Sequence, residues 1–174
     1  QRVSEADALV VASGAWAADH VAGVGGFLER ERHVACRIRP RAPAAFDPDS
    51  FPVFVMDTGD GRHFYGLPRH RLPGFKVGAT HVEGAAVHPD DASEATLTET
   101  EPARGFARDF APTGDGPVLG TRACVLSHSP DGDYLIDTVP GAENVVVAVG
   151  MSGHGFKTAP VVGEIAAALA TGSA

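Results

Sequence analysis

Three glycines, a histidine and a lysine gather in residues 150–157, Gly-Met-Ser-Gly-His-Gly-Phe-Lys. Because glycine has no side chain, a flat ring can approach the backbone at Gly153 and Gly155 closely. When such a loop opens a helix, its free amide hydrogens and the positive end of the helix dipole attract a negatively charged or electron-rich group. The segment therefore predicts either a site for an anion or a cofactor, or a plain turn between a strand and a helix.

Two lysines stand where a cation is unusual. Lys157 is expected in the first turn of a helix, where its charge opposes the helix dipole, so it indicates either an anionic partner or a solvated surface side chain. Lys76 follows Gly74 and Phe75 on an expected half-buried strand. Its side chain either reaches the edge of the sheet or takes part in chemistry.

Cys124 lies between Ala123 and Val125 on another expected strand. A free cysteine commonly packs as a small buried hydrophobic residue and is then inert. The alternative is a nucleophile or a covalent anchor for a cofactor, which requires a thiolate, and the neighbouring Arg122 would favour one. The pattern leaves both interpretations open.

The remaining polar candidates are weaker. Four histidines of the central region are spaced too irregularly for a metal site, and no metal is expected; they are His63, His70, His81 and His88. His154, flanked by glycines, is better suited to a polar contact with a ligand. Ser152 does not fit the nucleophile elbow of a hydrolase, because His154 occupies the place of the required final glycine.

Apolar strands at the two ends of the chain would position these residues. The β-branched run from Val145 is typical of a strand buried on both faces of a parallel sheet. After the glycine loop, the apolar periodicity of residues 161–169 predicts a helix that ends near Gly172. A second apolar run, residues 8–13, is followed by a short helical pattern over residues 15–22. These are two pieces of a doubly wound sheet.

The region between the two pieces favours antiparallel structure. Its expected strands are residues 33–39, 52–57, 63–67, 75–81, 118–127 and 134–137. Residues 58–62 form a hairpin-type turn, and a helix within residues 94–110 is expected to bury Phe106 and Phe110. The fold class is therefore α/β plus antiparallel β. Residues 1–30 and 118–174 are expected to be pieces of a nucleotide-binding domain, and residues 31–117 an inserted substrate domain.

Composition excludes several classes of protein. The chain has 174 residues, a net charge of -8 and two cysteines, Cys36 and Cys124. The acidic balance argues against a nucleic-acid or anionic-membrane surface, and no apolar run approaches the ~20 residues that span a bilayer. The low cysteine content indicates a reducing, cytoplasmic compartment. Because Gln1 lies shortly before an expected strand, we expect that the chain was cut from something longer or processed.

Residues 150–157 resemble the C-terminal flavin loop of the monomeric sarcosine oxidase family, within the D-amino-acid-oxidase-like flavoprotein superfamily. The similarity extends in the same order over residues 13–16, 64–68, 74–78, 123–124 and 131–137. The intervals from Tyr65 to Lys76 and from Cys124 to Lys157 also agree with the family's. The resemblance implies the C-terminal part of a Rossmann-like FAD-binding domain carrying an antiparallel-sheet substrate domain.

The resemblance implies an FAD site. Cys124 would form a thioether to the 8α carbon of the flavin. Some relatives in the family bind FAD without such a covalent bond. Gly153, His154 and Gly155 would contact the pyrimidine end of the ring, where the helix start stabilises negative charge. The implied cofactor-binding residues are Gly14, Trp16, Cys124, Gly153, His154, Gly155, Phe156 and Lys157.

On the substrate side, the resemblance implies that Lys157 binds a carboxylate, that Tyr65 lines the pocket and that Lys76 activates O2. His81 is also a candidate catalytic residue, although it lies one position beyond the family's histidine and Thr80 takes that place. A shift of one residue turns a strand side chain to the other face of the sheet.

The implied activity is FAD-dependent oxidation of a secondary-amine amino acid, N-methylated or cyclic, to an imine, with O2 reduced to hydrogen peroxide. The chain contains no G-x-G-x-x-G turn, so an N-terminal FAD-binding half is expected in the same polypeptide or as a separate chain. Two alternatives stay open: a flavin dehydrogenase with another electron acceptor, and a non-catalytic binding or assembly subunit.

Overall fold

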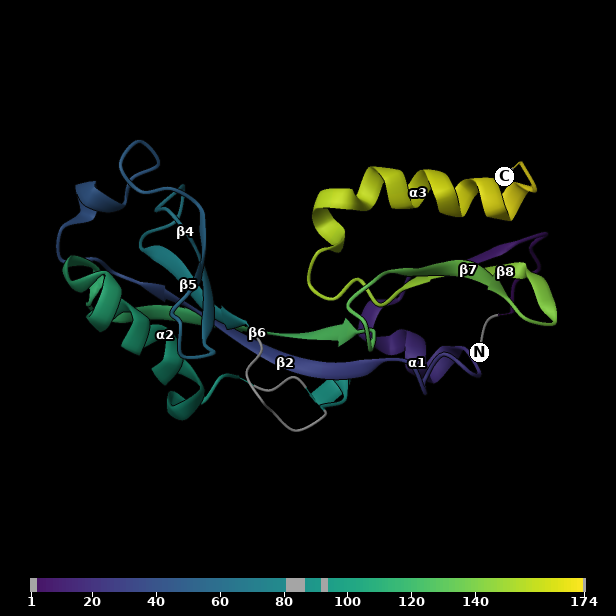
Figure 1. The fold of residues 1–174 in the computed structure, drawn as a ribbon, viewed down its shortest axis with the longest axis horizontal. Coiled ribbons are helices and arrows are strands. Elements are labelled where there is room, and N and C mark those ends of the chain that lie inside the picture. Colours follow the sequence, from purple (N-terminus) through teal and green to yellow (C-terminus); the bar gives the residue numbers. More distant parts are fainter. Residues whose placement is uncertain (1–2, 81–86, 92–93, 174) are drawn as a thin grey trace. The chain divides into compact units, whose positions relative to one another are not determined.

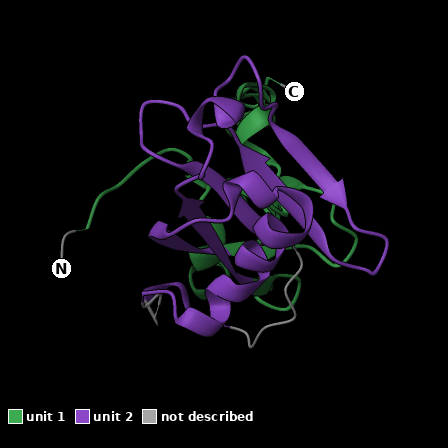
Figure 2. Cartoon of the chain, turned by 90° about the vertical axis from the view of Figure 1, so that its left-hand side faces the viewer, with its two compact units in different colours: residues 1–30, 126–174 green, residues 31–125 purple. Residues whose placement is uncertain are grey.

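The computed structural model describes residues 3–80, 87–91 and 94–173, and the chain divides into two compact units (Figures 1 and 2). Unit 1 contains Gln1–Arg30 and Leu126–Ala174, and unit 2 contains Glu31–Val125. Both boundaries fall inside long strands, β2 (Glu29–Ile38) and β6 (Val118–His128). No helix in the described ranges is long and apolar enough to cross a membrane.

Unit 1 is built on a three-stranded sheet of order β1-β8-β7, formed by β1 (Leu9–Val11), β8 (Ala142–Val149) and β7 (Leu135–Val139). The two terminal apolar runs lie side by side in this sheet, where β1 and β8 pair in parallel from Leu9 with Val145 onward. Helix α3 (Gly155–Thr171) packs along one side of this sheet, and α1 (Ala17–His20) lies on the other (Figure 1). The buried second half of β8 therefore has cover on both faces, as its run of valines predicts.

The backbone conformation of single residues determines where the helices of unit 1 end. α3 ends at Thr171, and Gly172 takes the left-handed conformation with φ 65° that commonly closes a helix, as predicted. The expected helix over residues 15–22 is shorter than predicted. It consists of a 3₁₀ turn, Gly14–Trp16, followed by the single turn of α1, because Val21 is already extended.

Unit 2 contains a five-stranded sheet of order β3-β4-β5-β2-β6. Besides β2 and β6 it includes β3 (Phe54–Asp57), β4 (His63–Leu67) and β5 (Phe75–Thr80). β3 and β4 are joined by the predicted hairpin, in which Gly59 and Gly61 have φ values of 79° and 84°. β5 pairs antiparallel with both β4 and β2.

The core of unit 2 lies between this sheet and α2 (Leu97–Phe110) and is rich in phenylalanine. Phe64, Phe75 and Phe106 are buried in it. Phe106 is buried as predicted, but the prediction for Phe110 was wrong, since its side chain is 46% exposed. Phe110 occupies the last turn of α2 and stacks on the outer side of Phe106, at 5.3 Å between ring centroids.

Candidate functional site

Tyr65 and Lys76 meet on the face of the unit 2 sheet opposite the aromatic core. Their strand neighbours Phe64, Phe75 and Val77 point into the core, so the alternation of a strand directs Tyr65 and Lys76 to the other face. The Lys76 Nζ lies 5.2 Å from the centroid of the Tyr65 ring. A cation over the face of an aromatic ring is attracted by the ring's electron density, so Tyr65 helps to hold the position of the ammonium group.

The phenol of Tyr65 stays protonated well into the alkaline range. Burial raises its pKa above the ordinary 10.0, and the nearby charge of a Cys124 thiolate raises it further. The Tyr65 hydroxyl is therefore a hydrogen-bond donor at neutral pH. Cys124 lies on β6 of the same sheet.

Cys124 lies on β6, the outermost strand of the sheet in unit 2, and it is exposed. Cys124 is therefore not buried, and its role as a cofactor anchor stays a prediction. Its thiol donates to the carbonyl oxygen of His33, with 3.8 Å between Sγ and O. The other cysteine, Cys36, is the buried one, and burial raises its pKa to about 11, with an opposing influence from Arg104.

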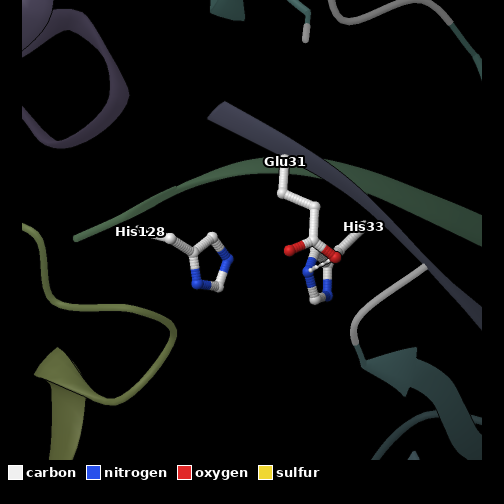
Figure 3. A group of neighbouring side chains, drawn as sticks. All are labelled: Glu31, His33 and His128. Carbon is white, nitrogen blue, oxygen red and sulfur yellow. Dashed lines mark ion pairs between the residues drawn. The ribbon is translucent and has the colours of Figure 1, made fainter. Parts of the chain in front are cut away.

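Sequence reasoning missed an ion pair on β2. Glu31 and His33 are two residues apart on this strand. His33 Nε2 lies 2.9 Å from Glu31 Oε1 (Figure 3). His33 is buried, and its carbonyl accepts from Cys124. The sequence signal was an acid and a histidine two residues apart on a strand, which places both on one face.

In unit 1, residues 150–153 make a tight turn between β8 and α3. Three of these four residues have positive φ: Gly150 at 67°, Ser152 at 47° and Gly153 at 81°. Ser152 is not a glycine, so its left-handed conformation needs support. The Ser152 hydroxyl donates to the carbonyl oxygen of Gly150 at 3.1 Å and accepts from the amide of Ser129 at 3.3 Å. These bonds give Ser152 a structural role.

The start of α3 is open to solvent in this chain. His154 occupies the N-cap position with an exposed side chain that makes no capping hydrogen bond, and Phe156 is 98% exposed. Lys157 lies in the first turn, as predicted, and is exposed. Gly155 is required by packing, since a Cβ there would come within 2.8 Å of Met151 Cβ. The first turn of α3 thus lacks a side-chain cap and lies among exposed residues, an arrangement that suits an electron-rich ligand.

The other predicted residues lie in unit 1 or outside the described ranges. Gly14 and Trp16 form the 3₁₀ turn after β1, where Gly14 has φ 56° and Trp16 is partly exposed. His81 lies outside the described residues, and its role stays a prediction. The structure brings Tyr65 and Lys76 together on the sheet of unit 2 that also carries Cys124, and it places residues 153–157 at the start of α3 in unit 1.

Comparison with known protein families identifies the family of this chain. A family model described as FAD dependent oxidoreductase, DAO, matches residues 1–169, and the chain belongs to this family. The membership confirms the resemblance drawn from residues 150–157.

Among curated proteins, the chain is 41% identical over 125 residues to an N-methyl-L-tryptophan oxidase from Salmonella typhi. It is 38% identical over 127 residues to the protein of that name from Citrobacter koseri. These matches cover 70% and 71% of this chain but 33% of each relative, so the chain spans about a third of the length of the curated relatives it matches.

Solved structures show the same fold. Fructosamine oxidase (Amadoriase II) from Aspergillus fumigatus matches 99% of this chain and 43% of its own, with a TM-score of 0.77 and 20% identity. Iminodiacetate oxidase from Chelativorans sp. BNC1 matches 99% of this chain and 44% of its own, with a TM-score of 0.74 and 20% identity.

Proposed function

We propose that this chain forms the substrate side and part of the flavin site of an oxidase. The enzyme would oxidise a secondary-amine amino acid, N-methylated or cyclic, to an imine and reduce O2 to hydrogen peroxide. The observation that carries the proposal is the pairing of Lys76 with Tyr65 beside an exposed Cys124 on one unit. The N-methyl-L-tryptophan oxidases among the relatives support it.

The residues present fit FAD. Unit 2 offers an exposed thiol at Cys124, and unit 1 offers the solvent-exposed start of α3, which no side chain caps and which has no bulky side chain at Gly153 or Gly155. FAD, when bound, accepts a hydride equivalent from the carbon next to the substrate nitrogen and passes the electrons to O2. Cys124 would anchor it covalently, and Gly14 and Trp16 would add contacts from the turn after β1.

The chain's own side chains would direct the chemistry electrostatically. The Lys76 ammonium would stabilise the negative charge that develops on O2 as electrons reach it. The helix dipole at the start of α3 would stabilise negative charge on an electron-rich ring. Lys157 would bind the substrate carboxylate, Tyr65 would line the pocket as a hydrogen-bond donor, and His81 would act on the substrate side.

A further part of the protein is needed to complete this site. α3 exposes apolar side chains at Phe156, Val161 and Ile165. An amphipathic helix normally buries such residues, so their exposure supports a covering segment. We propose that this segment is an N-terminal FAD-binding half in the same polypeptide, which the greater length of the curated relatives also supports.

The test is the intact mass and visible spectrum of the protein joined to its preceding half. A mass increase of one FAD that survives denaturation and maps to the Cys124 peptide supports the proposal. The Cys124→Ser variant should then release its flavin on denaturation, whereas Cys36→Ser should retain it. A colourless protein of unmodified mass, with both halves present, would favour a binding or assembly subunit.

The electron acceptor is tested separately by stopped-flow kinetics of the flavin. A protein that is reduced by N-methyl amino acids, but whose reduced flavin persists in air-saturated buffer, would favour a dehydrogenase. Rapid reoxidation with stoichiometric hydrogen peroxide supports the oxidase.

A further inference from the structure

A row of four cross-strand neighbours runs through Tyr65 on the sheet of unit 2. Val55 on β3 is opposite Tyr65 on β4, Tyr65 is opposite Gly78 on β5, and Gly78 is opposite Ala35 on β2. Val55 is 80% exposed, whereas Gly78 and Ala35 are buried. Tyr65 therefore has the exposed Val55 on one side and Gly78, which has no side chain, on the other.

The Tyr65 ring fills the place that Gly78 leaves. A Cβ on Gly78 would lie 2.5 Å from Tyr65 Cε1 and 2.6 Å from Cζ and from Oη. These separations are far below van der Waals contact, so no residue larger than glycine is compatible with this ring position.

Backbone conformation does not explain this glycine. Gly78 lies in the middle of β5 and is not one of the glycines with positive φ. A glycine inside a strand commonly marks a close approach of another group, and here that group is the phenol ring of Tyr65.

The ring position determines what Lys76 contacts. Lys76 precedes Gly78 by two residues on β5, so its side chain projects from the same face of the sheet. A ring that leans from β4 over Gly78 lies beside this side chain, at 5.2 Å between the ring centroid and Nζ. A ring forced off Gly78 would lose this position beside the ammonium group.

We propose that Gly78 is a positioning residue, whose missing side chain holds the Tyr65 ring against the Lys76 ammonium group. The contact between the Tyr65 ring and the Lys76 ammonium group is a structural feature that can be tested without activity. Its importance for O2 reduction rests on the proposed function, and the two are tested by different measurements.

The contact can be read directly by NMR, because the chain has two lysines, Lys76 and Lys157. Lysine labelled with ¹³C at Cε gives two signals, which the Lys157→Arg variant assigns. The ring current of Tyr65 should move the Lys76 ε-methylene protons upfield, so Tyr65→Leu should move this signal downfield. Gly78→Ala should produce the same downfield shift, and the double variant should add nothing. A Lys76 signal unchanged by Gly78→Ala would overturn the proposal.

Two further variants control for general damage. Gly120 lies on β6 of the same sheet, and a Cβ there would meet nothing within 4 Å, so Gly120→Ala should leave the Lys76 signal in place. Gly78→Ala is expected to lower the melting temperature only when the Tyr65 ring is present. The double variant Tyr65→Ala/Gly78→Ala should therefore melt at the same temperature as Tyr65→Ala alone. A loss of equal size with and without the Tyr65 ring would also overturn the proposal.

The catalytic consequence is measured in the enzyme joined to its preceding half. Gly78→Ala should slow flavin reoxidation by O2 by a larger factor than flavin reduction by substrate, and Tyr65→Leu should show the same split. A shifted Lys76 signal in a protein without flavin turnover would retain the positioning role and reject the proposed function. Normal turnover with an unchanged signal would reject the positioning role alone.

Discussion

The ammonium nitrogen of Lys76 lies 5.2 Å from the centroid of the Tyr65 ring, although eleven positions separate the two residues in the sequence. The antiparallel register of β4 and β5 makes this possible, since it pairs Tyr65 with Gly78 and Leu67 with Lys76. The cation and the ring are thus held by the hydrogen-bond ladder of the sheet, which is more rigid than a loop.

Replacing Lys76 by methionine should slow the reaction of the reduced flavin with O2 by about 10²-fold, the size expected when a preorganised charge is removed. Flavin reduction by the substrate should change much less. Stopped-flow measurement of the two half-reactions gives both rates. Lys76→Arg keeps the charge and serves as the matched control. Equal slowing of both half-reactions by Lys76→Met would contradict the role.

The two cysteines should differ sharply in reactivity. In the native apoprotein at pH 8, one thiol per chain should react rapidly with a disulfide reagent, because Cys124 is exposed and Cys36 is buried. The pKa of Cys36 of about 11 leaves it a thiolate fraction about 100-fold smaller than that of an ordinary thiol. Cys124→Ala should abolish the fast phase, and Cys36→Ala should preserve it. A fast phase that survives Cys124→Ala would show that Cys36 is accessible.

The pKa of Tyr65 should lie above the ordinary tyrosine value of 10.0. The chain has two tyrosines, so the absorbance at alkaline pH in the Tyr134→Phe variant reports Tyr65 alone. Burial is the main cause of the raised pKa, and the native state therefore favours the neutral phenol. This contribution to stability is full below pH 10.0 and is lost as the pH rises through the folded-state pKa. Cys124→Ser should lower the midpoint, because it removes the second cause. A midpoint at 10.0 with the fold intact by circular dichroism would contradict the burial of the ring.

Glu99 should stabilise unit 2 in a pH-dependent way. It accepts from Arg32 Nε at 2.6 Å and from the Thr96 amide at 2.8 Å, which completes a capping box at the start of α2. The Arg32 hydrogen bond and then the Thr96 backbone lower the pKa of Glu99 from 4.5 to about 2. A depressed carboxyl pKa stabilises the fold above pH 4.5, and the contribution disappears as the pH falls through 2.

Glu99→Gln should therefore cost about 1 kcal/mol of unfolding free energy at pH 7, the usual size of a helix-cap effect. Urea unfolding at pH 7 and at pH 3 measures it, and the difference between the two proteins should shrink at pH 3. A difference that is the same at both pH values would assign the loss to packing instead.

Local chemistry was sufficient to predict much of the fold. The β-branched run in β8, the glycine that ends α3 and the glycine-rich turn between β3 and β4 each depend on residues close together in the sequence. The exposure of Cys124 could not be predicted in this way. It depends on β6 being the outermost strand of its sheet, which the order of the strands decides.

The contacts of the candidate site were harder still to predict. The sequence indicated Tyr65 and Lys76 as separate candidates, but their approach depends on the register between β4 and β5 and on the space at Gly78. For Phe110, burial was predicted but the side chain is exposed. Its spacing from Phe106 indicated burial, but the helix ends there and its ring lies outside the core. Periodicity predicts which face of a helix is apolar. It does not predict how much of that face the neighbouring sheet covers.

The turn with left-handed backbone at Gly150, Ser152 and Gly153 also sets the rotation of α3 about its own axis. A helix advances about 100° per residue, so a single insertion or deletion between β8 and α3 would carry Lys157 around to a different side. It would also place a residue with a side chain at a position where the backbone tolerates only glycine without strain. The side of α3 on which Lys157 lies is therefore coupled to the number of residues between β8 and α3.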